Sequence, residues 1–255
     1  MTSVPEIVFK GVSKRFATNS ALVLQDIDLS IARGEFVSII GPSGCGKSTL
    51  LKLVAGLSPC TQGEIAVNGM TPKNAREMVS FVFQDATLLP WRTVERNVAL
   101  SLELEGRTRD ETAATVETLL ELVGLAKVGK SYPRQLSGGM KMRVSIARAL
   151  ATRPRVLLMD EPFAALDEMT RDRMNEELLR LREEQNWTVL FVTHSVAEAV
   201  FLSSRVIVLA PHPGRIAHEV AVDLPYPRTE ATRESAAFDE LVNRTSKLLR
   251  EAHRA

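Results

Sequence analysis

Hydrophobic residues along the chain gather in short runs that are apolar almost without interruption. Four such runs, rich in β-branched side chains, occupy residues 36–40, 156–159, 188–192 and 206–209. A strand with one face in water alternates apolar and polar positions, whereas a strand buried on both faces is apolar throughout. The four runs therefore predict parallel strands inside a sheet.

Helical periodicity lies between these runs. Two sets of apolar residues recur at intervals of three and four, as they do on one face of a helix. They are Leu50, Leu51, Val54 and Leu57, and then Met174, Leu178 and Leu181. Strands that alternate with helices in this way indicate an α/β domain with a parallel sheet.

The amino-terminal part has a different pattern. Residues 7–9 and 22–31 alternate only roughly, and residues 65–67 run directly into Asn68-Gly69, a strong signal for a tight hairpin turn. Antiparallel sheets can leave one face in water. We therefore expect a small antiparallel β layer beside the parallel sheet.

The middle of the chain is helical only, from about residue 91 to residue 152. Its clearest helical positions are Ala113, Val116, Leu119, Leu120 and Val123. Gly124 follows as a helix stop. We predict a domain at residues 6–227 with a helical subdomain inserted at about 91–152, and a charged, helix-prone tail at residues 228–255.

Composition narrows the class of protein. The chain of 255 residues has 32 basic and 31 acidic residues, a formal net charge of +1, which argues against a dedicated nucleic-acid binder. Two cysteines are too few for a disulfide scaffold. No apolar run approaches the length of a membrane span, and residues 1–10 contain no apolar signal core. The sequence predicts a soluble, cytosolic globular protein.

A phosphate-binding loop follows the first buried strand. Residues 41–48 read Gly-Pro-Ser-Gly-Cys-Gly-Lys-Ser and fit the pattern G-x-x-x-x-G-K-[ST] between a strand and a helix. Glycines allow backbone N–H groups to surround phosphates, and the helix N-terminus adds partial positive charge. We expect Lys47 to reach the β- and γ-phosphates and Ser48 to bind Mg²⁺. Cys45 occupies a variable position and is expected to be an inert small residue.

A second strand ends in two carboxylates. The apolar run at residues 156–159 is followed by Asp160 and Glu161, at the end of the strand where open α/β sheets bind their ligands. Asp160 fits the carboxylate that holds the Mg²⁺ shell. Glu161 fits a general base that polarises an attacking water. A solvated acidic turn is the alternative for the pair considered alone.

A second glycine-rich helix start lies in the helical region. Leu136-Ser137-Gly138-Gly139-Met140 offers Ser137 as an N-cap and exposes N–H groups that can bind phosphate. With the two preceding motifs, residues 6–227 resemble the ATP-binding subunit of an ABC transporter. The resemblance implies an α/β fold: a P-loop NTPase (RecA-like) core, an N-terminal antiparallel β layer and an inserted helical subdomain.

The resemblance also implies roles for single residues. Phe16 is expected to stack on adenine, Gln84 to link Mg²⁺ or the lytic water to the helical subdomain, and His194 to contact the γ-phosphate. Ser137, Gly138 and Gly139 are expected to contact the γ-phosphate held by a partner copy, next to Asp167 at the dimer interface. The full expected nucleotide-binding set adds the phosphate loop: Gly41, Pro42, Ser43, Gly44, Cys45, Gly46, Lys47, Ser48 and Thr49.

Taken singly, these residues fit ordinary structural roles. Phe16 alone indicates core packing, Gln84 and Asp167 alone indicate surface loops, and His194 alone indicates a structural histidine. Their order and spacing relative to the phosphate loop favour the functional interpretation. Neither cysteine lies near a histidine at metal-ligand spacing, so a zinc site is not indicated.

Two further segments point to one branch of the family. Residues 88–94, Leu-Leu-Pro-Trp-Arg-Thr-Val, and residues 211–216, Pro-His-Pro-Gly-Arg-Ile, resemble the nitrate, sulfonate and taurine importers. This resemblance implies an ATPase that uses ATP and Mg²⁺ on the cytoplasmic face of the cell (inner) membrane. The implied partners are transmembrane permease subunits, a second copy in a head-to-tail dimer and, indirectly, a solute-binding protein, with no nucleic acid. The apolar segment at residues 88–91 is either exposed for a membrane partner or buried in the helical subdomain.

Two other functions fit the sequence less well. An ABC-type ATPase that acts on nucleic acid or ribosomes is disfavoured by the balanced charge and by the single ATP cassette. A P-loop kinase or GTPase has no use for the loop Leu136–Met140, and no Asn is followed by Lys as in a guanine-binding motif. The choice of transported solute is expected to depend on the permease and the solute-binding protein.

Overall fold

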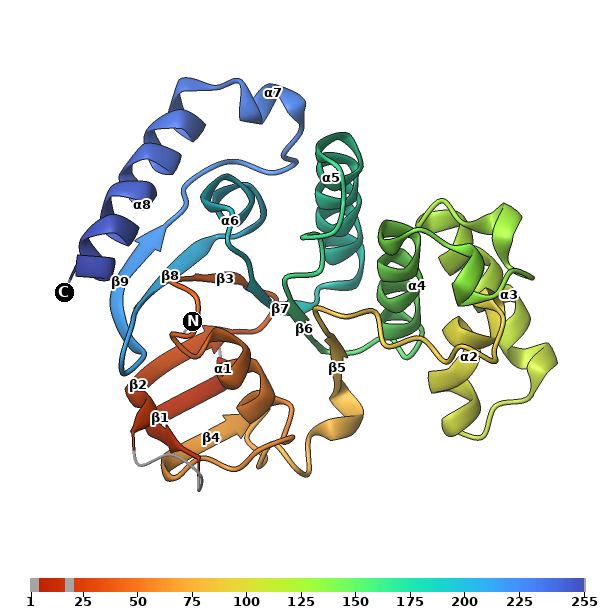
Figure 1. Cartoon of the computed structure of the whole chain (residues 1–255), viewed down its shortest axis with the longest axis horizontal. Helices are drawn as coiled ribbons and strands as arrows, with labels where there is room; N and C mark the ends of the chain where they lie inside the picture. The colour runs from red at the N-terminus through yellow and green to blue at the C-terminus, as the bar shows by residue number, and fades with distance from the viewer. Residues whose placement is uncertain (1–4, 17–20, 255) are drawn as a thin grey trace.

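The computed structural model describes residues 5–16 and 21–254. Two β-sheets organise these residues, a three-stranded sheet with the order β2-β1-β4 and a six-stranded sheet with the order β5-β6-β7-β3-β8-β9. Figure 1 shows the two sheets together at one side of the molecule, with helices α2, α3 and α4 projecting at the other. The fold is therefore an α/β core with a separate helical region, as the sequence predicts.

The small sheet is antiparallel. It comprises β1 (Pro5–Arg15), β2 (Leu22–Ala32) and β4 (Gln62–Val67). After β4, Asn68 and Gly69 have φ angles of 50° and 73°, and two hydrogen bonds of 2.8 and 3.0 Å join Val67 and Met70. These left-handed positions suit asparagine and glycine. The antiparallel layer and its tight turn are confirmed.

The large sheet is mixed rather than purely parallel. Its strands are β3 (Phe36–Ile40), β5 (Val79–Val82), β6 (Val156–Asp160), β7 (Thr188–Val192), β8 (Arg205–Ala210) and β9 (Arg215–Ala221). The four predicted strands are confirmed and pair in parallel, but β9 pairs antiparallel with β8. The predicted parallel sheet extends from β5 to β8, and β9 adds an antiparallel edge because it is a short-range hairpin partner of β8. Three of its seven residues are exposed and three are half-buried, so it has no uninterrupted apolar run.

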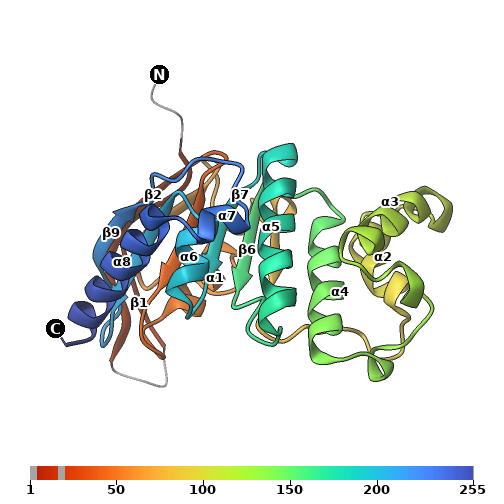
Figure 2. The same ribbon diagram turned by 90° about the horizontal axis from the view of Figure 1, so that it is seen from above.

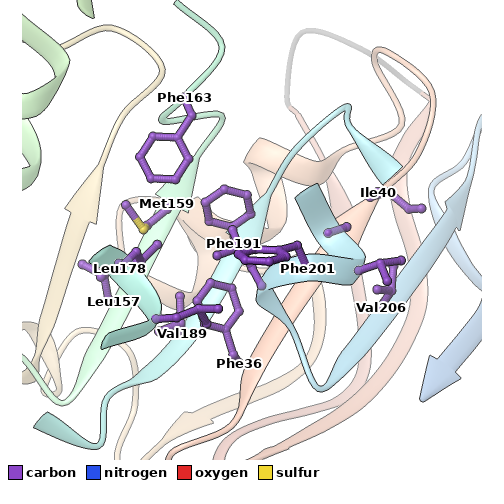
Figure 3. Close-up of a cluster of buried hydrophobic side chains, with 14 of the residues drawn as sticks. Phe36, Ile40, Leu157, Met159, Phe163, Leu178, Val189, Phe191, Phe201 and Val206 are labelled. Atoms are coloured by element: carbon purple, nitrogen blue, oxygen red, sulfur yellow. The ribbon is translucent and has the colours of Figure 1, made fainter. Parts of the chain in front are cut away.

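Successive residues of the central strands feed two different hydrophobic clusters. Phe36, Phe191 and Val206 face the helices α4, α5, α6 and α8, whereas Val37, Leu190 and Ile207 face α1 and the small sheet. Figure 3 shows the first cluster, in which Phe191 lies between Phe36 and Phe163, with ring centroids 5.9 and 5.8 Å away. Burial on both faces accounts for the uninterrupted apolar runs.

Five helices surround this core: α1 (Lys47–Val54), α5 (Glu168–Gln185), α6 (Val196–Leu202), α7 (Glu230–Arg233) and α8 (Ala236–Arg254). The prediction is wrong for Leu57, which follows α1 and is 56% exposed, because Gly56 turns the chain with φ +64°. Helix α8 lies along α6 and β8, and its Phe238 and Ala252 belong to the cluster of Figure 3. The predicted tail thus contributes to the core.

The helical region comprises α2 (Val94–Leu104), α3 (Arg109–Leu122) and α4 (Gly138–Leu150). It has its own cluster, which includes Val98, Val116 and Val144. The prediction that Ala113 lies on the apolar face of its helix is wrong. Ala113 is exposed, and its neighbour Thr112 is buried. In Figure 2 these helices extend away from the sheets, with α4 nearest to α5.

Short turns of 3-10 helix, Arg76–Met78, Ala126–Val128 and Pro133–Gln135, complete the described structure. None of the helices within residues 5–16 and 21–254 combines the length and the apolar character that crossing a bilayer requires.

Candidate nucleotide site

The loop after β3 has the geometry of a phosphate cradle. Gly44 and Gly46 have φ angles of 78° and 97°. At Gly41 a Cβ atom would lie 2.8 Å from Cys45 Sγ and 2.9 Å from the carbonyl oxygen of Leu209, so that only glycine fits there. The backbone is therefore free to turn its N–H groups toward an anion at the start of α1.

Lys47 is held inside this loop. Its side chain is buried, and its Nζ donates to the carbonyl oxygens of Gly41 at 2.8 Å and Pro42 at 2.9 Å. An ammonium group has three N–H donors. The third has no acceptor within the described residues, and it is available to an oxygen of a bound phosphate.

The remaining loop residues differ in exposure. Ser43 is exposed and Thr49 is half-buried in the first turns of α1. Cys45 is buried, and burial raises the pKa of its thiol despite the nearby Lys47 charge. A thiol that stays protonated is a poor nucleophile. This environment supports the expectation that Cys45 is a packing residue.

Ser48 and Asp160 form a second element of the site. Ser48 Oγ donates to Asp160 Oδ1 at 2.9 Å, which joins the start of α1 to the end of β6. Asp160 is 5% exposed, and burial raises its pKa, although the hydrogen bond from Ser48 and the charges of Lys52 and Lys47 oppose the shift. A buried carboxylate of this kind is stabilised by a cation.

The donor set fits Mg²⁺ only together with a nucleotide. No group of three or more His, Cys, Asp or Glu side chains converges within the described residues. Mg²⁺ characteristically uses one or two protein ligands, waters and substrate phosphate oxygens. The Ser48 hydroxyl and the Asp160 carboxylate at 2.9 Å from one another match that requirement.

Three predicted residues meet at the carboxylate of Glu161. His194, which follows β7, places Nε2 2.6 Å from Glu161 Oε1, and Gln84, which follows β5, donates from Nε2 to Oε2 at 3.4 Å. Glu161 itself has φ +49°, and its backbone N–H donates to Val192 at 2.9 Å. Strands β5, β6 and β7 are neighbours and parallel, so these segments end at one edge of the sheet.

A buried carboxylate that the sequence analysis missed, that of Glu198, contacts Thr193, the residue before His194. Thr193 donates its hydroxyl to Glu198 and accepts a hydrogen bond from the Ser195 N–H at 3.0 Å. Burial raises the pKa of Glu198. The hydrogen bond from Thr193 and the charge of Arg171 lower this pKa, but by less. The signal in the sequence is an acidic residue within a helix whose other residues are mainly apolar.

The other predicted residues lie apart from this cluster. Phe16 is 41% exposed beyond β1, with Lys14 Nζ 4.9 Å from its ring centroid. Ser137 caps α4 by accepting from the Met140 N–H at 3.2 Å. Asp167 caps α5 by accepting from the Thr170 N–H at 2.9 Å, a bond that lowers the pKa of Asp167.

The glycines of the second glycine-rich loop open onto different surroundings. A Cβ atom at Gly138 would contact nothing, whereas one at Gly139 would lie 2.7 Å from Leu166 Cδ2. Among residues 5–16 and 21–254, no hydrogen bond or ion pair joins Ser137 to the phosphate loop. One chain therefore presents two separate surfaces suited to phosphate.

Comparison with known proteins identifies the family. Residues 24–164, more than half of the chain, match the ABC transporter family. The chain belongs to the ABC transporter family. It is 46% identical over 240 residues to a putative ATP-binding protein of Brucella abortus, with 94% of this chain and 92% of the relative covered. It is also 47% identical to the aliphatic sulfonates import ATP-binding protein SsuB 1 of Xanthomonas axonopodis pv. citri, with 88% of each chain covered.

Solved structures of ABC cassettes share the fold. A dimeric structure of the ATP-binding cassette MJ0796 in a post-hydrolysis state, bound to ADP and Pi, matches with a TM-score of 0.79 and 32% identity, covering 86% of this chain and all of that one. The predicted ATP-binding cassette and its ATPase class are thereby confirmed. The roles of the individual site residues remain predictions.

Proposed function

We propose that this ABC ATPase energises the import of an aliphatic sulfonate. The similarity to proteins named for that import carries the proposal, since identities of 44% and 47% extend over 91% and 88% of this chain, in the proteins of Bacillus cereus and Xanthomonas. Nitrate, taurine or a related compound are the alternative solutes that the sequence resemblance implies. The nucleotide chemistry below is common to all of them.

The proposed nucleotide site begins at the phosphate loop. Lys47 and the loop N–H groups bind the β- and γ-phosphates, and Phe16 stacks on the adenine. Ser48 and Asp160 would hold Mg²⁺, with Gln84 as a further ligand, and the ion would supply positive charge to the phosphate groups.

Glu161 is the proposed general base. Its carboxylate lies between His194 and Gln84, with contacts of 2.6 and 3.4 Å, and can accept a proton from a water that attacks the γ-phosphate. His194 contacts the γ-phosphate on the other side. Gln84 follows β5 and His194 follows β7, so a shift of either strand end changes the contacts of the Glu161 carboxylate.

The pocket is proposed to be completed by a second copy of the chain. Within the described residues, no hydrogen bond or ion pair joins Ser137, Gly138 or Gly139 to the phosphate loop of their own chain, although their N–H groups at the start of α4 suit an anion. In a head-to-tail dimer they cover the γ-phosphate bound by the partner, with Asp167 at the interface. The dimeric structures of the MJ0796 cassette support this arrangement.

A permease is the proposed membrane partner. Trp91 is 71% exposed and Leu104 is 80% exposed, at opposite ends of the segment that contains α2. Trp91 therefore agrees with the exposed alternative for residues 88–91, while Leu89 is half-buried. Aromatic side chains such as Trp91 are enriched at protein–protein interfaces. We place the dimer on the cytoplasmic face of the cell (inner) membrane, where it acts indirectly on a solute-binding protein outside.

The test is reconstitution of the chain with its permease in lipid vesicles. We expect a binding protein loaded with an alkanesulfonate to stimulate ATP hydrolysis and solute uptake, and the empty binding protein to stimulate neither. Nitrate and taurine serve as competing solutes, and Lys47→Ala serves as the inactive control. Equal stimulation by all loaded and empty binding proteins would exclude the proposed import function.

A further inference from the structure

One arginine joins the helix that starts at Ser137 to the loop that contains Gln84. Arg148, near the C-terminal end of α4, donates from Nη1 to the Thr87 carbonyl oxygen at 3.0 Å and from Nη2 to the Ala86 carbonyl oxygen at 3.0 Å. Nη2 also lies 3.1 Å from Thr87 Oγ1. The planar guanidinium thus binds three acceptors in two consecutive residues.

The partial burial of the Arg148 charge costs free energy because water is removed from the guanidinium. It is half-buried, and burial lowers its pKa; no carboxylate forms an ion pair with it within the described residues. A desolvated cation that is paired only with neutral oxygens is a poor choice for stability alone. Its partners are the carbonyl groups of the Gln84 loop and the Ser145 hydroxyl, on α4 itself, at 3.4 Å.

The loop that Arg148 holds is strained. Thr87 has φ +46°, a left-handed conformation that is costly for a β-branched side chain. Such a conformation persists only where surrounding contacts impose it. The three hydrogen bonds from Arg148 are contacts of that kind. When they are lost, Thr87 is expected to leave its left-handed conformation.

A second anchor attaches the far end of the same loop to α2. The fully buried Asn97 accepts from the Leu89 N–H at 2.8 Å and donates to the carbonyl oxygens of Leu89, Arg92 and Thr93 at 3.0–3.1 Å. Helices α2 and α4 pack together in one cluster. Residues 86–93 are therefore bound to the helical subdomain by Arg148, by Asn97 and by the ion pair of Arg92 with Glu103, whereas Gln84 reaches the sheet side through one bond of 3.4 Å.

We propose that Arg148 is a positioning residue that makes Gln84 follow the Ser137 end of α4. The proposal rests on the function proposed above. Arg148 lies ten residues after Gly138 on one helix, about 15 Å along its axis, so movement of the Ser137 surface toward a partner's nucleotide moves Ala86 and Thr87 with it. Gln84, two residues earlier, then changes its position relative to Glu161. The guanidinium of Arg148 forms no hydrogen bond with the phosphate loop or with Glu161 within the described residues.

The first test compares Arg148→Lys with Arg250→Lys, an exposed arginine on α8 that serves as the matched control. Lysine keeps the charge but lacks the fork that binds two carbonyl groups at once. We expect Arg148→Lys to lower kcat about tenfold with the ATP dissociation constant unchanged and the midpoint temperature close to that of the parent. An unchanged kcat, or an equal loss of ATP affinity, would overturn the proposal.

A double-mutant cycle separates positioning from general structural damage. If Arg148 acts through Gln84, the variant Gln84→Ala/Arg148→Lys hydrolyses ATP no more slowly than Gln84→Ala alone. Losses that multiply would show that Arg148 acts independently and would contradict the inference. Thr87→Gly, which keeps the carbonyl acceptors and removes the strain, is expected to retain most of the activity. If the parent protein does not hydrolyse ATP, the proposed function fails; if the parent is active and the cycle is additive, only the role of Arg148 fails.

Discussion

Replacing Glu161 by glutamine changes proton acceptance with little change in shape. The side chain is 12% exposed and contacts His194 at 2.6 Å and Gln84 at 3.4 Å, and an amide of nearly the same size can occupy the same space. Lys47, Ser48 and Asp160, which we propose to bind phosphate and Mg²⁺, form no hydrogen bond with Glu161 within the described residues. We therefore expect Glu161→Gln to bind ATP as the parent does.

The expected loss of turnover follows from the chemistry of general bases. A positioned base contributes roughly 10²–10⁴-fold to the rate, which corresponds to about 3–5 kcal/mol in activation free energy. The variant should therefore hydrolyse ATP at least a hundredfold more slowly, by the same estimate. Bound ATP that is not consumed should also hold the two copies together.

Phosphate release, equilibrium binding of a fluorescent ATP analogue and light scattering measure these three properties. Glu251→Gln, on the exposed side of α8, removes a carboxylate far from the site and is the matched control. Hydrolysis within about threefold of the parental rate would refute the assignment of Glu161. A large loss of ATP affinity would show instead that Glu161 organises the binding site.

Three other predictions address the pocket, the metal and stability. Lys47→Ala and Ser137→Arg chains, each inactive alone, should regain ATPase activity when mixed, because a mixed head-to-tail dimer has one intact pocket; no recovery on mixing would count against that dimer. Asp160→Asn should bind ATP in EDTA but lose the gain in affinity that Mg²⁺ gives the parent, as titration calorimetry can show. Burial raises the pKa of Glu198 in spite of Arg171 and Arg233, so its stabilising contribution is present at low pH and is lost as pH rises from the unfolded value of 4.5 through the folded one. Glu198→Gln should therefore gain thermal stability relative to the parent as pH increases over this range, and melting curves that stay parallel would contradict this.

The central strands were predictable because burial on both faces requires apolar residues at every position. Phe36–Ile40 and Thr188–Val192 are buried at every position, and an unbroken apolar run of this length is typical of a strand covered on both faces. Val79–Val82 was missed because three of its four residues are only half-buried and the run is short. Arg215–Ala221 was missed because this edge strand mixes exposed and half-buried residues and has no uninterrupted apolar run.

In the candidate site, residues that are contiguous in the sequence could be predicted together, whereas residues that only the fold brings together could not. The phosphate loop is contiguous, so that Gly41, Lys47 and Ser48 could be identified together. The cluster at Glu161 depends on three segments that meet only because β5, β6 and β7 are adjacent, and composition alone does not encode that order. The resemblance to ABC transporters supplied Gln84 and His194. It did not supply Arg148 or Glu198, whose partners are backbone carbonyl groups and a neighbouring hydroxyl.

Helix α8 has a consequence for how the protein is made. Phe238 and Ala252 fill the cluster beside α6 and β8, where Phe201 and Phe238 stack edge to face with centroids 6.5 Å apart. A ribosome adds residues from the amino terminus, so the part of this cluster beside α6 and β8 lacks the cover of α8 until residues 236–254 have been synthesised. Prematurely terminated chains should expose that apolar surface and become targets for chaperones and proteases, which would keep damaged cassettes from occupying the transporter.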